Sequence, residues 1–232
     1  METVSPIYSS HAKCPVCESE FEYTKVRSKA IKLKQQDSDF CPWYEGENPV
    51  LYEAVICPEC GYGSHITNID KISRNEKAKV REKISSRWHK RSFSGKRDID
   101  KALEAFKIVL LNLKEREAPS SEIAKISMRI AWLYRYKEDR ESEKAFLNYA
   151  LKYYVDSFKN EDFSRNGIDT YTLIFIIGEL YRRLEHYEDS MQWFSRLIQS
   201  YSDPAKKDKI PPRLIDTARD LIQEIKQDRA MA

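Results

Sequence analysis

Cys14-Pro15-Val16-Cys17 and Cys57-Pro58-Glu59-Cys60 are the two stretches that decide the fold of this chain. Each Cys-x-x-Cys turn can present two thiolates to one ion, and four sulfur ligands complete a tetrahedral zinc site. Gly61 after the second turn can adopt the positive φ that such a knuckle uses. Apolar and β-branched residues in the ranges 20–33 and 50–56 predict short strands. The spacing therefore predicts a zinc ribbon in which one structural Zn²⁺ ion is bound by Cys14, Cys17, Cys57 and Cys60.

Other uses of these cysteines fit the sequence less well. A thioredoxin-like redox site has one Cys-x-x-Cys motif on a βαβ frame, and this chain has two such motifs. Four thiolates fill the zinc shell and leave no position for an activated water, so the ion is expected to be structural. Cys41 can replace a knuckle ligand, but a half-buried free thiol is favoured. His11 and His65 flank the knuckles and are expected on the surface.

Length and composition predict two unequal parts. The 232 residues, 41% hydrophobic and 33% charged, suffice for a helical domain over 71–232 beside a small zinc-ribbon module over 1–70. The beginning of the chain has no basic stretch followed by an apolar one. The longest apolar run, Leu173–Ile177, is far below the roughly 20 residues that a bilayer requires. Paired cysteines are typical of a reducing compartment, so we expect a cytoplasmic protein with no membrane contact.

The formal net charge of +3 is distributed unevenly. Residues 1–70 hold six Lys and Arg against eleven Asp and Glu, a net −5, whereas residues 71–97 hold eleven against two, a net +9. Residues 98–232 are close to neutral, at −1. Attraction across the junction is expected to hold the ribbon against the first helices.

A period of 3.6 residues predicts helices through most of the remainder. Ser73-Arg-Asn-Glu76 is a capping box that opens a first helix ending near Arg91. The further predicted helices begin near Asp98 and after Pro119, cover about 140–157, 169–184 and 187–201, and end with one opened by Pro211 and Pro212.

Small and aromatic residues recur at similar points of alternate predicted helices. The pairs are Ala102 and Phe106, Ala145 and Tyr149, and Ser190 and Phe194. Gly178-x-x-Tyr181 followed by Tyr187-x-x-Ser190-x-x-x-Phe194 resembles the tetratricopeptide pattern. The copies are 43 and 45 residues apart, longer than that family's 34. The resemblance implies a mainly α solenoid of about three helix pairs with a C-terminal capping helix; the alternative is an unrelated helical bundle.

Three segments together resemble a bacterial family known only as domain of unknown function 2225. They are Cys-Pro-Val-Cys, the stretch Asp37-Ser-Asp-Phe-Cys-Pro-Trp-Tyr-x-Gly-x-Asn-Pro49, and Cys-Pro-Glu-Cys-Gly-Tyr62. The resemblance covers most of the chain and implies knuckles, an aromatic and acidic loop and tetratricopeptide-like helices. It implies no activity.

Two surfaces and one loop are candidates for function. A solenoid groove suits a protein or peptide partner, with Tyr134, Tyr153, Tyr171 and Trp193 as candidate contacts. The basic segment 71–97 suits nucleic acid through Lys79, Lys83, Lys90 and Arg91. The loop 37–49 offers aromatic and acidic groups to a ligand, or it docks on the adjacent basic helix.

Motifs for phosphate binding, metalloprotease or nucleophilic chemistry are absent from the sequence. We therefore expect a non-enzymatic adaptor that recruits a protein partner, with a nucleic-acid-binding regulator as the alternative. The partner, the oligomeric state and the role of Cys41 do not follow from the sequence.

Overall fold

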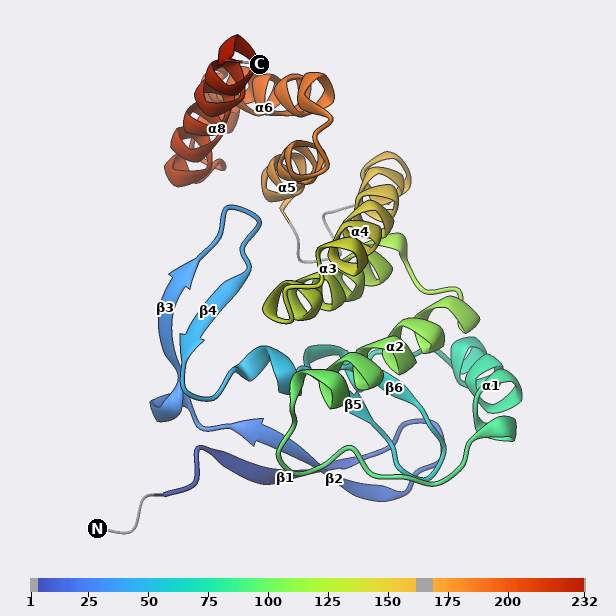
Figure 1. The fold of residues 1–232 in the computed structure, drawn as a ribbon. Helices are drawn as coiled ribbons and strands as arrows, with labels where there is room; N and C mark the ends of the chain where they lie inside the picture. Colours follow the sequence, from blue (N-terminus) through green and yellow to red (C-terminus); the bar gives the residue numbers. More distant parts are fainter. Residues whose placement is uncertain (1–3, 162–168, 232) are drawn as a thin grey trace.

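The computed structural model describes residues 4–161 and 169–231, and it confirms a mainly helical chain with short antiparallel strand pairs near its N-terminus (Figure 1). The strands are β1 (Ile7–Lys13), β2 (Glu20–Val26), β3 (Lys32–Gln36), β4 (Pro42–Glu45), β5 (Ala54–Ile56) and β6 (Gly63–His65). The helices are α1 (Arg74–Lys83), α2 (Ile99–Glu115), α3 (Ser120–Tyr136), α4 (Arg140–Asn160), α5 (Thr170–Arg183), α6 (Tyr187–Tyr201), α7 (Pro204–Lys207) and α8 (Pro212–Met231). Among the described residues, none of the helices combines the length and apolarity needed to cross a membrane.

Consecutive strands pair into three separate hairpins, β1–β2, β3–β4 and β5–β6. The predicted strand ranges contain β2 and β5 and the first residues of β3, whereas β1, β4 and β6 lie outside them. The missed strands lack an apolar alternation that marks a buried face. Every residue of β3 is exposed. The β3–β4 hairpin is therefore a two-stranded sheet that does not bury β3 against another sheet.

Most helices begin and end within a few residues of the predicted positions, because aspartates cap their N-termini. The side chains of Asp98, Asp139 and Asp169 accept hydrogen bonds from backbone amides in the first turns of α2, α4 and α5. The prediction for the first helix was wrong at its end: α1 stops at Lys83, a 3₁₀ turn follows, and the chain is extended at Trp88. The short helix α7 was not predicted.

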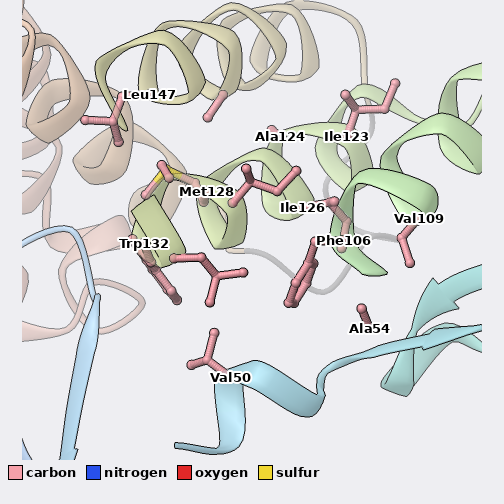
Figure 2. Close-up of a cluster of buried hydrophobic side chains, with 14 of the residues drawn as sticks. Val50, Ala54, Phe106, Val109, Ile123, Ala124, Ile126, Met128, Trp132 and Leu147 are labelled. Atoms are coloured by element: carbon pink, nitrogen blue, oxygen red, sulfur yellow. The ribbon is translucent and has the colours of Figure 1, made fainter. Parts of the chain in front are cut away.

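The largest hydrophobic core is shared between the N-terminal residues and the helices. Val50 and Ala54 pack in one cluster with Phe106 and Val109 of α2 and with Trp132 of α3 (Figure 2). The hairpin β5–β6 therefore packs on α2. The domain boundary at residue 70 stays a prediction, since the apolar contacts cross it.

Two smaller clusters complete the interior. One surrounds the knuckles and includes Val80 of α1 and Ile84 directly after it, so the first helix packs on the cysteine-containing module. The other joins α5, α6 and α8 at the far end of the chain (Figure 1). Its fully buried members include Phe175, Phe194 and Ala218.

Candidate metal centre

The four knuckle cysteines come together and could hold a metal ion, and theirs is the one such grouping of His, Cys, Asp or Glu in the part of the chain that the structure describes. Their Sγ atoms all lie within 4.8 Å of one another. Cys14 Sγ is 3.6 Å from Cys60 Sγ, and Cys17 Sγ is 3.6 Å from Cys57 Sγ. A tetrahedral ion with sulfur at about 2.3 Å requires sulfur atoms about 3.8 Å apart, so the donor set fits one ion.

The two knuckles share one backbone geometry. Glu18 amide donates to the carbonyl of Cys14 at 2.9 Å, and Gly61 amide donates to that of Cys57 at 3.0 Å. Both residues have positive φ, 65° for Glu18 and 73° for Gly61. The first knuckle therefore adopts the left-handed turn without the glycine that favours it. The shared turn aims both cysteine pairs at one point.

Residues from α1 and the segment after it brace the knuckles. Trp88 Nε1 donates to the carbonyl of Pro58 at 2.8 Å, and Arg81 Nε donates to that of Val16 at 3.1 Å. A Cβ atom on Gly61 would lie 2.5 Å from the Trp88 ring, so the indole covers the second knuckle directly. This contact requires Trp88 to leave the helix, which accounts for the early end of α1.

The thiols are free and mostly buried. Hydrogen bonds from Cys57 and Cys60 lower the pKa of the Cys14 thiol, and the same contacts with Cys14 raise the pKa of Cys57 and of Cys60. Cys41 lies outside the cluster, fully buried, where burial raises its pKa to about 12. Of the two histidines, His11 is exposed as expected, whereas the prediction for His65 was wrong: it is 8% exposed and contacts Glu53 at 3.2 Å.

The four basic residues assigned to nucleic acid are each paired with a glutamate. Lys79 contacts Glu117 at 2.6 Å, Lys83 contacts Glu115 at 3.3 Å, and Arg91 contacts Glu104 at 2.6 Å. Lys90 pairs with Glu59 inside the second knuckle. The Lys90–Glu59 pair agrees with the predicted attraction between the acidic module and the basic segment.

The four aromatic residues assigned to a partner separate into two places. Tyr134 stacks on Phe146 with ring centroids 5.6 Å apart, and Tyr153 lies 4.9 Å from Tyr149 further along α4. Tyr171 and Trp193 pack instead against the cluster of α5, α6 and α8. The structure therefore does not bring all four to one groove.

The tip of the β3–β4 hairpin docks on α3 and α5, which corrects the suggestion that the loop 37–49 lies on the basic helix. Asp39, fully buried, accepts hydrogen bonds from Arg135 Nη2 at 2.6 Å and Nη1 at 2.9 Å. Ser38 donates to Glu179 at 2.6 Å, and Phe40 packs on Phe175 with centroids 5.6 Å apart.

The buried charges of this tip were missed as an anchor. Burial alone would raise the pKa of Asp39, but the hydrogen bonds from Arg135 and the charge of Arg183 outweigh it and the pKa is lowered. Asp39 is ionised at neutral pH and its charge is compensated. The only signal in the sequence was the Asp-x-Asp-Phe pattern, which names no partner helix.

Fold and site together define a mainly helical protein with an N-terminal cluster of four cysteines that could hold a metal ion. The family described as Uncharacterized protein conserved in bacteria (DUF2225) matches residues 7–225, and the chain belongs to this family, as the resemblance predicted. No curated protein matched the chain. No solved structure matched it either.

Proposed function

We propose that this protein is a non-enzymatic, cytoplasmic adaptor in which one structural Zn²⁺ ion stabilises the N-terminal module and tetratricopeptide-like helices recruit a protein or peptide partner. Four Sγ atoms within 4.8 Å of one another support the assignment of a zinc site. Four thiolates would fill the coordination shell and leave no open position for substrate or water, which supports a structural role. Free thiols that serve a metal are typical of a reducing compartment.

A repeated turn supports the helical repeat. The turns after α2, α3 and α5 each contain a glutamate with positive φ, namely Glu117, Glu138 and Glu185. Each turn has the two hydrogen bonds of a Schellman motif, for example Glu138 amide to the carbonyl of Arg135 and Asp139 amide to that of Tyr134, both 3.0 Å. Identical turns between successive helices are expected of a repeat architecture.

The small residues of the repeated small-and-aromatic pairs are buried in two of the three predicted copies, which supports the repeat. A Cβ atom on Gly178 would lie 2.9 Å from Phe194, so α5 and α6 approach closely. Ala102 and Ser190 are fully buried. Ala145 is exposed, however, so the middle copy does not use its pair in the same way. We propose a shortened solenoid of α2–α6, closed by α8.

One aromatic and basic surface carries the proposal of partner binding. Along α4, Phe146, Tyr149 and Tyr153 follow each other at helical spacing, and Tyr134 of α3 continues the row. Ammonium groups lie over these rings at 5.4–6.0 Å from the centroids: Lys107 over Tyr134, Lys114 over Tyr149 and Lys152 over Tyr153. Leu111 of α2 is 49% exposed.

This surface, which we call the α2–α4 face, suits an acidic peptide with apolar anchors. Half-buried tyrosines supply contact area at low entropic cost, and the lysines supply complementary charge. The chemistry therefore favours an acidic segment of another protein as the partner.

The test is affinity capture with the purified full chain from a lysate of its own bacterium, quantified by mass spectrometry. We expect a defined partner that is lost with the double variant Tyr149→Ala/Tyr153→Ala and retained with Tyr171→Ala, the matched aromatic change outside this face. Circular dichroism verifies that each variant is folded. Capture that is equal for both variants would reject the α2–α4 face.

A nucleic-acid-binding regulator stays the alternative, favoured by the net +9 of residues 71–97. Phosphate-driven binding weakens steeply as salt rises. If the chain binds heparin or RNA at 50 mM salt, and the triple change Lys79→Glu/Lys83→Glu/Lys90→Glu abolishes it, the alternative stands. No retention at low salt removes it.

A further inference from the structure

A cavity of about 360 Å³ lies between the β3–β4 hairpin, the turn 49–52 and helices α3, α4 and α5. Its volume is in the range of small-molecule sites. Most of its wall is apolar, from Leu33, Phe40, Pro42, Val50, Met128 and Ile176. Val50 and Trp132, which Figure 2 labels in the hydrophobic cluster, also line this space.

Two tyrosine hydroxyls without a hydrogen bond among the described residues also line the cavity. Tyr154 is only 6% exposed, and its hydroxyl makes no hydrogen bond within the described residues. The hydroxyl oxygen is not among the polar atoms buried without a partner, so it is open to the cavity and free to bond a ligand there. Burial raises the pKa of Tyr154 to about 12, which keeps the hydroxyl protonated. Tyr44, on β4, lines the same cavity and likewise has no hydrogen-bond partner for its hydroxyl among the residues described.

Arg129 adds a cationic group to the wall. Its Nε donates to Glu53 Oε2 at 2.7 Å, which leaves Nη1 and Nη2 without a hydrogen bond in the described structure. The guanidinium carbon lies over the Trp132 ring, 4.2 Å from its centroid, so a cation–π contact helps to hold the group in place.

The acids of the wall are already compensated. Asp39 is bound by Arg135, and Glu53 is bound by Arg129 and by His65 at 3.2 Å. The charge of Arg129 is shared with Glu53, but its Nη1 and Nη2 and the two tyrosine hydroxyls have no hydrogen bond among the described residues and can donate to a carboxylate.

We propose that this cavity binds a small organic carboxylate with an apolar chain or ring. The carboxylate lies against Arg129 and the hydroxyls of Tyr44 and Tyr154, and the apolar part fills the space between Phe40, Val50 and Ile176. This site is separate from the metal centre and from the α2–α4 face, so it does not depend on the proposed adaptor function.

The experiment is calorimetric titration of the purified full chain with octanoate, 3-phenylpropionate and octan-1-ol. We expect at least one carboxylate to bind and octan-1-ol to bind about tenfold more weakly or not at all, because it lacks the charge. Tyr154→Phe removes a hydroxyl that holds no other residue, and should weaken carboxylate binding about tenfold. Arg129→Gln should weaken it at least as much.

Tyr153→Phe is the matched control, since it removes a hydroxyl from the next residue of α4 at a position outside the cavity. It should leave the affinity unchanged. The proposal is overturned if neither carboxylate binds, if octan-1-ol binds as tightly, or if Tyr154→Phe has the affinity of the parent chain. Circular dichroism checks the fold, and if Arg129→Gln is unfolded, Tyr154→Phe alone decides.

Discussion

The knuckles and the β3–β4 hairpin belong to the same N-terminal seventy residues but are held in different ways. The knuckles bring four thiols together inside a small apolar cluster that includes Val16, Phe21 and Val80. The hairpin has no sheet behind it and is held at its tip by charges, with Asp39 bound to Arg135 from 96 residues further along the chain. The four-cysteine cluster is thus assembled from two turns braced by α1 and Trp88, whereas the hairpin depends on helices further along the chain.

This difference predicts separate failures. Loss of the metal should loosen the knuckles and leave the helical core, and loss of the buried charges should release the hairpin and leave the metal. Glu53 links the module that contains the knuckles to the helices, because it contacts Arg129 on α3 and His65 on β6.

The largest effect is expected from removing two thiols, Cys57→Ser/Cys60→Ser. Zinc contributes on the order of 10 kcal/mol to the folding of small four-ligand modules. The variant should lose its ion and its resistance to protease in the ranges 7–26 and 54–70, while α3–α6 stay protected. Elemental analysis and limited proteolysis with mass spectrometry measure both results.

The matched thiol control is Cys41→Ser, which should retain one zinc per chain because Cys41 lies outside the cluster. Parent protein without stoichiometric zinc, or unchanged protection in the double variant, would contradict a metal-held module.

The second effect comes from Asp39→Ala, which removes the fully buried carboxylate shared by Arg135 and Arg183 and leaves Arg135 with Asp37 and Glu143, each at 2.7 Å. Breaking a buried ion pair from one side costs about 3–5 kcal/mol. Urea unfolding should report this loss, and hydrogen exchange should localise it to β3–β4. Asp100→Ala removes the partner of Lys137 on the surface and should leave stability within error. If the two variants were equal, the packing of Phe40 rather than charge would hold the tip.

The contrast also explains what the sequence could predict. The metal ligands follow from spacing within four residues, and the helix bounds from periodicity and from caps such as Asp98 and Asp139. The docking of Asp39 on Arg135 depends on partners far away in the chain, and no local pattern encodes it. The early end of α1 depends on the contact of Trp88 with the second knuckle, which likewise exists only in three dimensions.

A pH effect of intermediate size should come from Glu53. Burial alone would raise its pKa, but the charge of Arg129 and the hydrogen bond of His65 bring it to about 2. Because the unfolded carboxyl has a pKa of 4.5, the unfolded state binds more protons below that value. The contribution is present in full above about pH 5 and is lost as pH falls toward 2.

Glu53→Gln should therefore be less stable than the parent by roughly 2–3 kcal/mol at pH 6, with the difference shrinking by pH 3. Urea unfolding of both proteins at each pH measures it, and the comparison at equal pH cancels any shared loss of zinc in acid. If the difference in unfolding free energy between the two proteins were the same at pH 6 and pH 3, the ionised Glu53 carboxylate would not be what stabilises the parent.

The smallest expected effect is the difference in stability between Gly61→Ala and Gly46→Ala. It separates the loss caused by a clash with Trp88 from the loss caused by backbone strain. Gly46 in the hairpin and Gly61 in the knuckle have φ of 86° and 73°, so alanine costs about 1–2 kcal/mol of backbone strain at either position. Only at Gly61 would the added Cβ meet a ring, 2.5 Å from Trp88, whereas nothing lies within 4 Å at Gly46. Gly61→Ala should thus lose more stability than Gly46→Ala by about 1 kcal/mol, and it alone should raise the protease sensitivity of the knuckle module. Equal losses in urea unfolding would mean that Trp88 moves aside freely, and that the knuckles are held by their metal without the indole.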